Sequence, residues 1–66
     1  MRKNDIKKLR RCAGLLESAL ERITKVAEGD SELNASDHDF IHGLQQELRY
    51  RIGALRRWAK QEEESL

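Results

Sequence analysis

The 66-residue sequence has no proline, one cysteine and only three aromatic residues. Sandwiches and barrels need many strands rich in β-branched and aromatic residues, so this composition excludes them and suits long solvated helices. The one cysteine, Cys12, permits no internal disulfide and no cysteine-based zinc site, in keeping with a reducing compartment. We expect Cys12 to be a small buried residue at the edge of the apolar contact row of a helix.

Long apolar runs are also absent. No stretch approaches the length that spans a bilayer, and the charged opening MRKNDIKK leads into no apolar signal core. Charged residues make up 38% of the chain, the same share as hydrophobic residues. We therefore expect a soluble, cytoplasmic protein with no membrane partner.

What the sequence does contain is two apolar series with helical spacing. One runs from Ile6 to Ala27 and the other from Ile41 to Ala59, with steps of three and four residues. Folding the chain back near residue 32 sets the two series opposite each other in six layers. The layers pair Ile6 with Ala59, Leu9 with Leu55, Ala13 with Ile52, Leu16 with Leu48, Leu20 with Leu44, and Ile23 with Ile41. The predicted fold is an all-α, antiparallel αα-hairpin.

Capping and turn signals divide this single domain into three segments: a first helix over residues 5–28, a loop over 29–36 and a second helix over 37–62. Asn4 or Asp5 is the expected N-cap of the first helix. Gly29 is the expected left-handed residue that stops it. Ser36, followed by Asp37 and Asp39, has the form of a capping box with an acidic first turn.

We call each of the two apolar series a seam. Further apolar residues lie beside each seam and make the apolar stripe wider than a two-helix contact requires. They are Leu15, Ala19, Val26, Phe40 and Trp58. A lone pair of helices leaves one side of each apolar stripe in water, and a chain of this size buries little by itself. We therefore expect a homodimer in which two hairpins form a four-helix bundle. The alternative is that these residues cover the flanks of a small monomer.

The net charge of +1 hides a segregation of charge along the hairpin. The segments carry +4 over residues 1–28, −3 over 29–37, +3 over 38–60 and −3 over 61–66. In an antiparallel hairpin the start of the first helix and the end of the second share one end, which is therefore basic, while the loop end is acidic. Basic residues at a helix start oppose the helix dipole, which favours a role in contacts. The alternative is a solvated face masked by the glutamates at 62–64.

Four arginines and a tyrosine are the expected partner-binding residues: Arg10, Arg11, Arg49, Tyr50 and Arg56. Arginine and tyrosine are typical of interface hot spots, and an acidic protein surface would complement them. Nucleic acid is the alternative partner, with cations on phosphates and Tyr50 or Trp58 stacked on a base. The chain has no helix-turn-helix pattern, which counts against it. A third possibility is an inhibitor that lends its helices to another protein's bundle.

Signals for catalysis and metal binding are weak. His38 and His42 stand four residues apart with Asp39 after the first, an echo of the zinc-protease helix, but no third ligand has a recognisable spacing. Serine, cysteine and histidine form no nucleophile arrangement, and the glycines form no phosphate loop. A two-helix hairpin also offers no concave pocket. We expect a non-enzymatic protein without metal or cofactor.

Three features of the chain can be compared with known families: the opening MRKNDIKKLRRCAGLLESALERI, the proline-free hairpin and the EEESL tail. In these features the chain resembles the small accessory proteins of lambdoid phages that are encoded between the exonuclease and excisionase genes. The resemblance implies a regulator of the lysis–lysogeny decision in the cytoplasm of a bacterial host, acting through host or phage regulatory proteins. The layout is also similar to the plasmid RNA-binding hairpin that dimerises into a four-helix bundle, a likeness of architecture alone.

Overall fold

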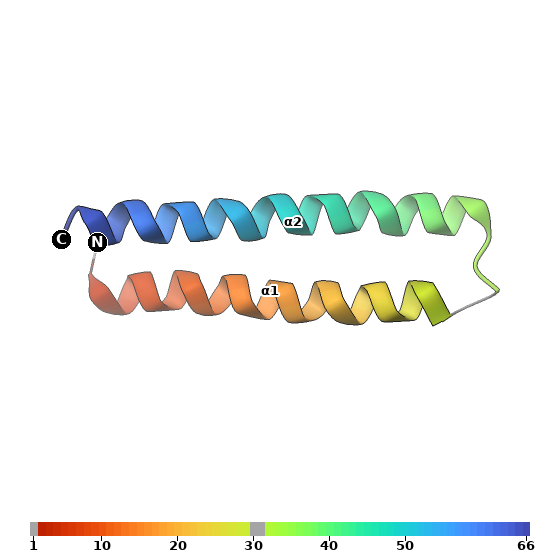
Figure 1. Cartoon of the computed structure of the whole chain (residues 1–66), viewed down its shortest axis with the longest axis horizontal. Helices are drawn as coiled ribbons and strands as arrows, with labels where there is room; N and C mark the ends of the chain where they lie inside the picture. The colour runs from red at the N-terminus through yellow and green to blue at the C-terminus, as the bar shows by residue number, and fades with distance from the viewer. Residues whose placement is uncertain (1, 30–31) are drawn as a thin grey trace.

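The structure, a computed structural model, describes residues 2–29 and 32–66. It contains two helices, α1 (Lys3–Gly29) and α2 (Ala35–Glu64). They run side by side in opposite directions, so the two termini lie at one end of the molecule (Figure 1). The Cα positions extend over 50 × 15 × 10 Å, the shape of a short rod. The predicted helical hairpin is confirmed. Over the described residues, neither helix is long and apolar enough to cross a membrane.

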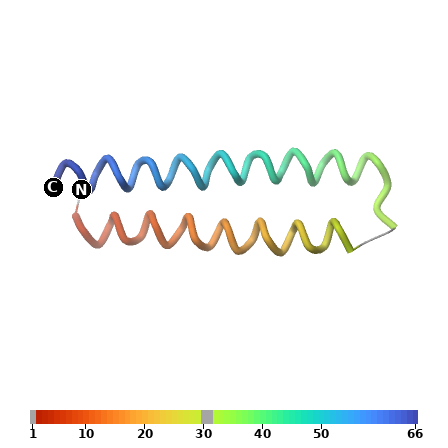
Figure 2. Tube along the Cα trace, in the orientation of Figure 1, coloured from red at the N-terminus to blue at the C-terminus, as the bar shows by residue number. Residues whose placement is uncertain are grey.

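Both helices are continuous coils from end to end (Figure 2). The absence of proline explains this continuity, because a proline would remove a backbone donor and push against the preceding turn. The two helices therefore stay in contact over their whole length, and the core is a single row of side chains between them.

The core follows the two predicted series. Its buried residues are Ile6, Ala13, Ile52 and Ala59. The other seam residues are half-buried, except Leu44, which is 39% exposed. Among the described residues no large side chain is completely enclosed, since two helices cannot surround a row of side chains. The single row of core side chains is therefore only partly shielded from water.

The start of α2 differs from the prediction. Its N-cap is Asn34, not Ser36, and the helix begins at Ala35. The Asn34 side chain accepts a hydrogen bond from the Asp37 backbone N–H at 2.9 Å, and the Asp37 carboxylate accepts one from the Asn34 N–H at 3.3 Å. A capping box is present, but two residues earlier than expected, because asparagine caps as well as serine does.

The ends of α1 also differ. The backbone N–H groups of Asp5 and Ile6 donate to the carbonyl of Arg2, so Asp5 lies within the first turn and Asn4 within the helix. Gly29 is the last residue of the helix, and no described residue has a positive φ. The prediction that a left-handed Gly29 stops the helix is therefore wrong. The residues that follow, 30 and 31, lie outside the described part of the chain.

Candidate interaction surfaces

Polar contacts tie α1 to α2 along one flank of the hairpin. They are the ion pairs Arg10–Glu63 and Glu17–Arg56 and a hydrogen bond from Gln45 to Thr24. The Arg10 Nη1 and Glu63 Oε2 atoms are 2.6 Å apart. The Gln45 Nε2 atom lies 2.9 Å from the Thr24 hydroxyl. These side chains close one edge of the core.

The position of these residues in the heptads explains why they share a flank. On α1 each stands one residue after a seam residue, as Arg10 follows Leu9 and Glu17 follows Leu16, which turns it 100° away from the seam. Their partners on α2 must lie on the same side in order to reach them. We call this surface the polar flank: Arg10, Glu17, Thr24, Gln45, Arg56 and Glu63.

The predicted dimer-interface residues lie on the opposite flank. Each stands one residue before a seam residue, as Leu15 precedes Leu16 and Trp58 precedes Ala59, which turns it 100° the other way. Since the residues after the seam meet on one side, the residues before the seam meet on the other. We call this surface the apolar flank: Leu15, Ala19, Val26, Phe40 and Trp58.

The apolar flank is open to solvent. The exposed fractions are 61% for Leu15, 63% for Val26, 73% for Phe40 and 46% for Trp58, while Ala19 is half-buried. Scattered apolar residues are normal on a protein surface, but large ones gathered along one side mark an interaction site. The structure therefore brings the five predicted interface residues onto one surface.

Charged residues on α2 interrupt the apolar flank at its centre. Glu47 and Arg51, each one residue before a seam position, form an ion pair with Nε and Oε1 2.8 Å apart. Towards the end of the helix, the Trp58 indole N–H donates to Glu62 at 3.3 Å. Exposed contacts of this kind add little stability, so the charges stay available to a partner.

Cys12 also belongs to this side of the hairpin. It is exposed, so the prediction of a buried filler is wrong. The reason is its place one residue before Ala13, which turns it out of the seam. The buried row is narrower than the sequence pattern suggested.

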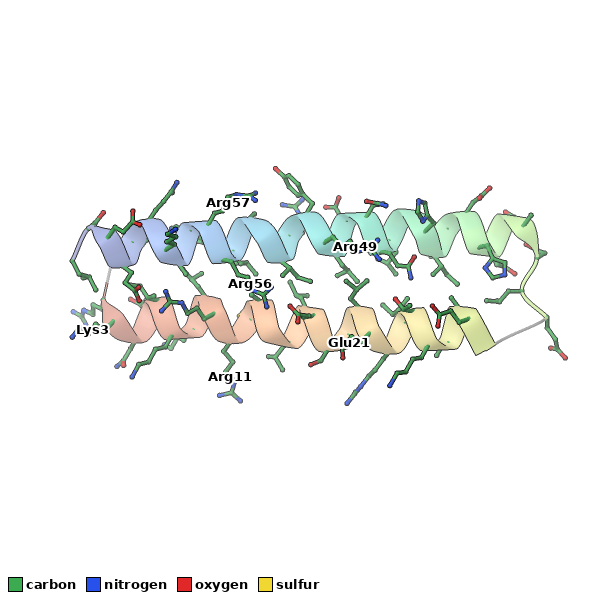
Figure 3. All side chains as sticks on the ribbon, viewed as in Figure 1. Lys3, Arg11, Glu21, Arg49, Arg56 and Arg57 are labelled. Atoms are coloured by element: carbon green, nitrogen blue, oxygen red, sulfur yellow. The ribbon has the colours of Figure 1, made fainter. Side chains whose placement is uncertain are left out.

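The five predicted partner-binding residues do not form one surface. Arg10, Arg49 and Arg56 are on the polar flank or beside it, while Arg11 and Tyr50 are on outer faces. Figure 3 shows Arg49 and Arg56 on the side of α2 nearest α1, and Arg11 projecting from α1 away from α2. Tyr50 is 62% exposed. It stands seven residues, or about two helical turns, before Arg57 and therefore shares its face of α2. Arg57 projects away from α1 (Figure 3). The Arg51 guanidinium lies 5.8 Å from the centre of the Tyr50 ring.

The Arg10–Glu63 pair changes the charge at the end of the rod. The hydrogen bond from Arg10, and then its positive charge, lowers the pKa of Glu63, while the same contacts raise the pKa of Arg10. Both side chains are about half exposed, so water and salt screen the pair. Glu63 masks one cation of the basic end, as Glu17 masks Arg56.

The rod nevertheless keeps opposite charges at its two ends. Residues 2–11 and 56–66 contain nine Lys/Arg and four Asp/Glu, a balance of +5. Residues 21–45, at the loop end, contain two Lys/Arg and six Asp/Glu, a balance of −4. The field of the molecule is therefore that of a dipole along its long axis.

The described surface contains two shallow hollows. The prediction that the hairpin has no concavity is therefore wrong. One hollow, of about 140 Å³, lies at the open end and is lined by Lys3, Ile6, Lys7, Arg10, Glu63 and Leu66. The other, of about 360 Å³, lies beside Thr24 and Arg49 and is lined mainly by charged side chains. Both are open to solvent and neither encloses a histidine, serine or cysteine. Among the described residues no group of three or more His, Cys, Asp or Glu side chains could hold a metal ion.

Comparison with protein-family models, with curated proteins and with solved structures finds no match to this chain. The resemblance to accessory proteins of lambdoid phages therefore stays a prediction.

Proposed function

We propose that this chain is a small regulatory adaptor that works by protein–protein contacts, without catalysis. In this proposal two hairpins join through the apolar flank and form a four-helix bundle. The observation that carries the proposal is the one-sided distribution of Leu15, Val26, Phe40 and Trp58, opposite the flank that polar contacts close.

The accessible area of the hairpin supports a dimer. A folded monomer of 7.7 kDa is expected to expose about 4,300 Å². The hairpin exposes 5339 Å², an excess of about 1,000 Å². A standard protein interface covers about 800 Å² on each partner. Pairing two hairpins would remove an area of this size from water.

A dimer joined in this way leaves other surfaces for a further protein. The polar flank and the outer faces, with Arg11, Arg49 and Tyr50, stay outside the bundle and suit an acidic partner surface. The resemblance to phage accessory proteins predicts that this partner is a host or phage regulatory protein in the bacterial cytoplasm. Nucleic acid is the weaker candidate, because carboxylates already engage Arg10 and Arg56 and the cations point in several directions.

The test of the apolar flank is a matched pair of variants. Leu15→Glu/Val26→Glu places charges on the apolar flank, whereas Tyr50→Glu changes an outer-face residue of nearly the same exposure. We expect the double variant to sediment near the monomer mass of 7.7 kDa and the Tyr50 variant near twice that mass. Equal masses for the two variants would contradict the assignment of the interface.

A second test separates protein from nucleic-acid binding. Phosphate contacts release counterions, so binding to DNA or RNA should weaken steeply as salt rises. We expect no such mobility shift at physiological salt, and we expect Arg49→Glu/Arg56→Glu to lose a protein captured by the wild type. A steeply salt-dependent shift would favour the nucleic-acid alternative.

A further inference from the structure

We infer that the two hairpins pack antiparallel, with α2 of one copy against α2 of the other about a two-fold axis level with Arg49. This inference rests on the proposed dimer and specifies its geometry. The loops then lie at opposite ends of the bundle. The competing order, with both loops at one end, places α1 of one copy against α2 of the other.

The α2 side of the apolar flank is nearly symmetric about residue 49. Its row consists of Phe40, Leu44, Glu47, Arg51, Ala54 and Trp58. Phe40 and Trp58 lie at equal distances on either side of this level, as do Leu44 and Ala54, and Glu47 and Arg51. A two-fold contact between α2 and α2 of a second copy requires this property, because residue i of one copy must suit residue j of the other and j must suit i.

Each symmetric pair is chemically complementary. The axis sets Trp58 against Phe40 of the partner subunit, two exposed aromatic rings that can stack edge to face. It sets Leu44, 39% exposed, against Ala54 of the partner subunit, a large residue against a small one. It sets Glu47 against Arg51 of the partner subunit, a carboxylate against a guanidinium.

On α1 the same axis passes near Leu15. The core layer that pairs Leu16 with Leu48 places Leu15 level with Arg49. Leu15 then meets Leu15 of the partner subunit at the centre of the interface. Cys12 meets the region of Ala19 of the partner subunit, so small residues allow close approach there. Lys8 faces Arg22 of the partner subunit, an unfavourable pair, and both are exposed side chains that can turn into water.

The charges at the two ends of the rod favour the same order. An antiparallel pair places the +5 end of one hairpin beside the −4 end of the other. The competing order would set like charges together at both ends, which costs free energy and slows encounter. The symmetric row and the charge dipole are independent observations that select one arrangement.

Distances between spin labels at the ends of α2 test this order. A Cys12→Ser chain carries one label, at Ser65→Cys or at Ala35→Cys, and its mass is measured in the same sample. With a rise of 1.5 Å per residue from the axis, we expect label separations of about 48 Å for position 65 and about 42 Å for position 35. The competing order predicts about 15 Å at both positions, the diagonal of a four-helix bundle.

The outcomes separate the two claims. A dimer mass with long distances at both positions supports the antiparallel order. A dimer mass with short distances overturns that order alone and leaves the proposed dimer intact. A monomer mass for the unlabelled Cys12→Ser chain overturns both.

Discussion

Glu63 masks one of the cations at the basic end of the rod. It accepts a hydrogen bond from Arg10 across the two helices, and its pKa lies below the ordinary value of 4.5 for this reason. A carboxylate with a lowered folded pKa stabilises the fold above its unfolded pKa. This contribution is lost as the pH falls through the folded pKa.

We therefore expect a pH-dependent effect of Glu63→Gln. At neutral pH and low salt the variant should unfold slightly more easily than the wild type, and the difference should disappear in acid below the lowered pKa. Thermal unfolding followed by circular dichroism at a fixed chain concentration measures this difference. Glu64→Gln is the control for loss of a negative charge alone. A difference that persists in acid would exclude the ion pair as its cause.

Asn34 is the residue where the observed helix start can be tested against the predicted one. Its side chain caps α2, so Asn34→Ala should lower the free energy of unfolding by about 1 kcal/mol. Ser36→Ala should change it by only a few tenths, since Ser36 is an exposed residue of the first turn. Urea unfolding of the two variants decides between the caps. A larger loss for Ser36→Ala would contradict the observed N-cap.

At the scale of the helices, the sequence was a good guide to which residues face each other. The steps of three and four predicted the seam, and only Leu44 among the paired residues is exposed. Periodicity could not rank neighbouring turn residues as caps, because asparagine and serine serve equally well. It also could not show Cys12 leaving the seam, since a heptad pattern does not give the width of a buried row.

The flanks of the helices were only partly predictable. The widened apolar pattern selected the five residues of the apolar flank, but the pattern treats the two helices separately. The side on which each set lies depends on which residues of α1 and α2 meet. The Arg10–Glu63, Glu17–Arg56 and Thr24–Gln45 contacts supply this information. Long charged side chains can reach several oppositely charged neighbours, so these pairs could not be predicted from the sequence alone.

Charge reversal on α2 gives a test at this scale. Glu47→Arg and Arg51→Glu each place like charges opposite one another in an antiparallel dimer, twice because of the symmetry. We expect each variant alone to raise the dimer Kd roughly tenfold, since each exposed pair contributes up to about 1 kcal/mol. Mixing the two variants restores opposite charges at both places, so a mixed dimer should form.

Analytical ultracentrifugation of the separate and mixed variants measures this rescue. The helicity of each variant serves as the control for the Glu47–Arg51 pair within the helix. If mixing leaves the affinity unchanged, Glu47 does not face Arg51 of a partner subunit.

As a whole, the molecule is too small to cover all of its apolar side chains. A rod of 66 residues with one row of core side chains leaves Leu15, Val26, Phe40 and Trp58 in water along one flank. Chains of this size usually need a disulfide, a metal or a partner in addition to their core. One cysteine allows no internal disulfide, so a partner is the expected means of stabilisation.

Sedimentation equilibrium of the wild-type chain over a range of concentrations, with helicity recorded on the same samples, tests this claim most directly. We predict a mass near twice 7.7 kDa, with helicity that falls as dilution separates the copies. A chain that stays at 7.7 kDa and fully helical at every concentration would contradict it.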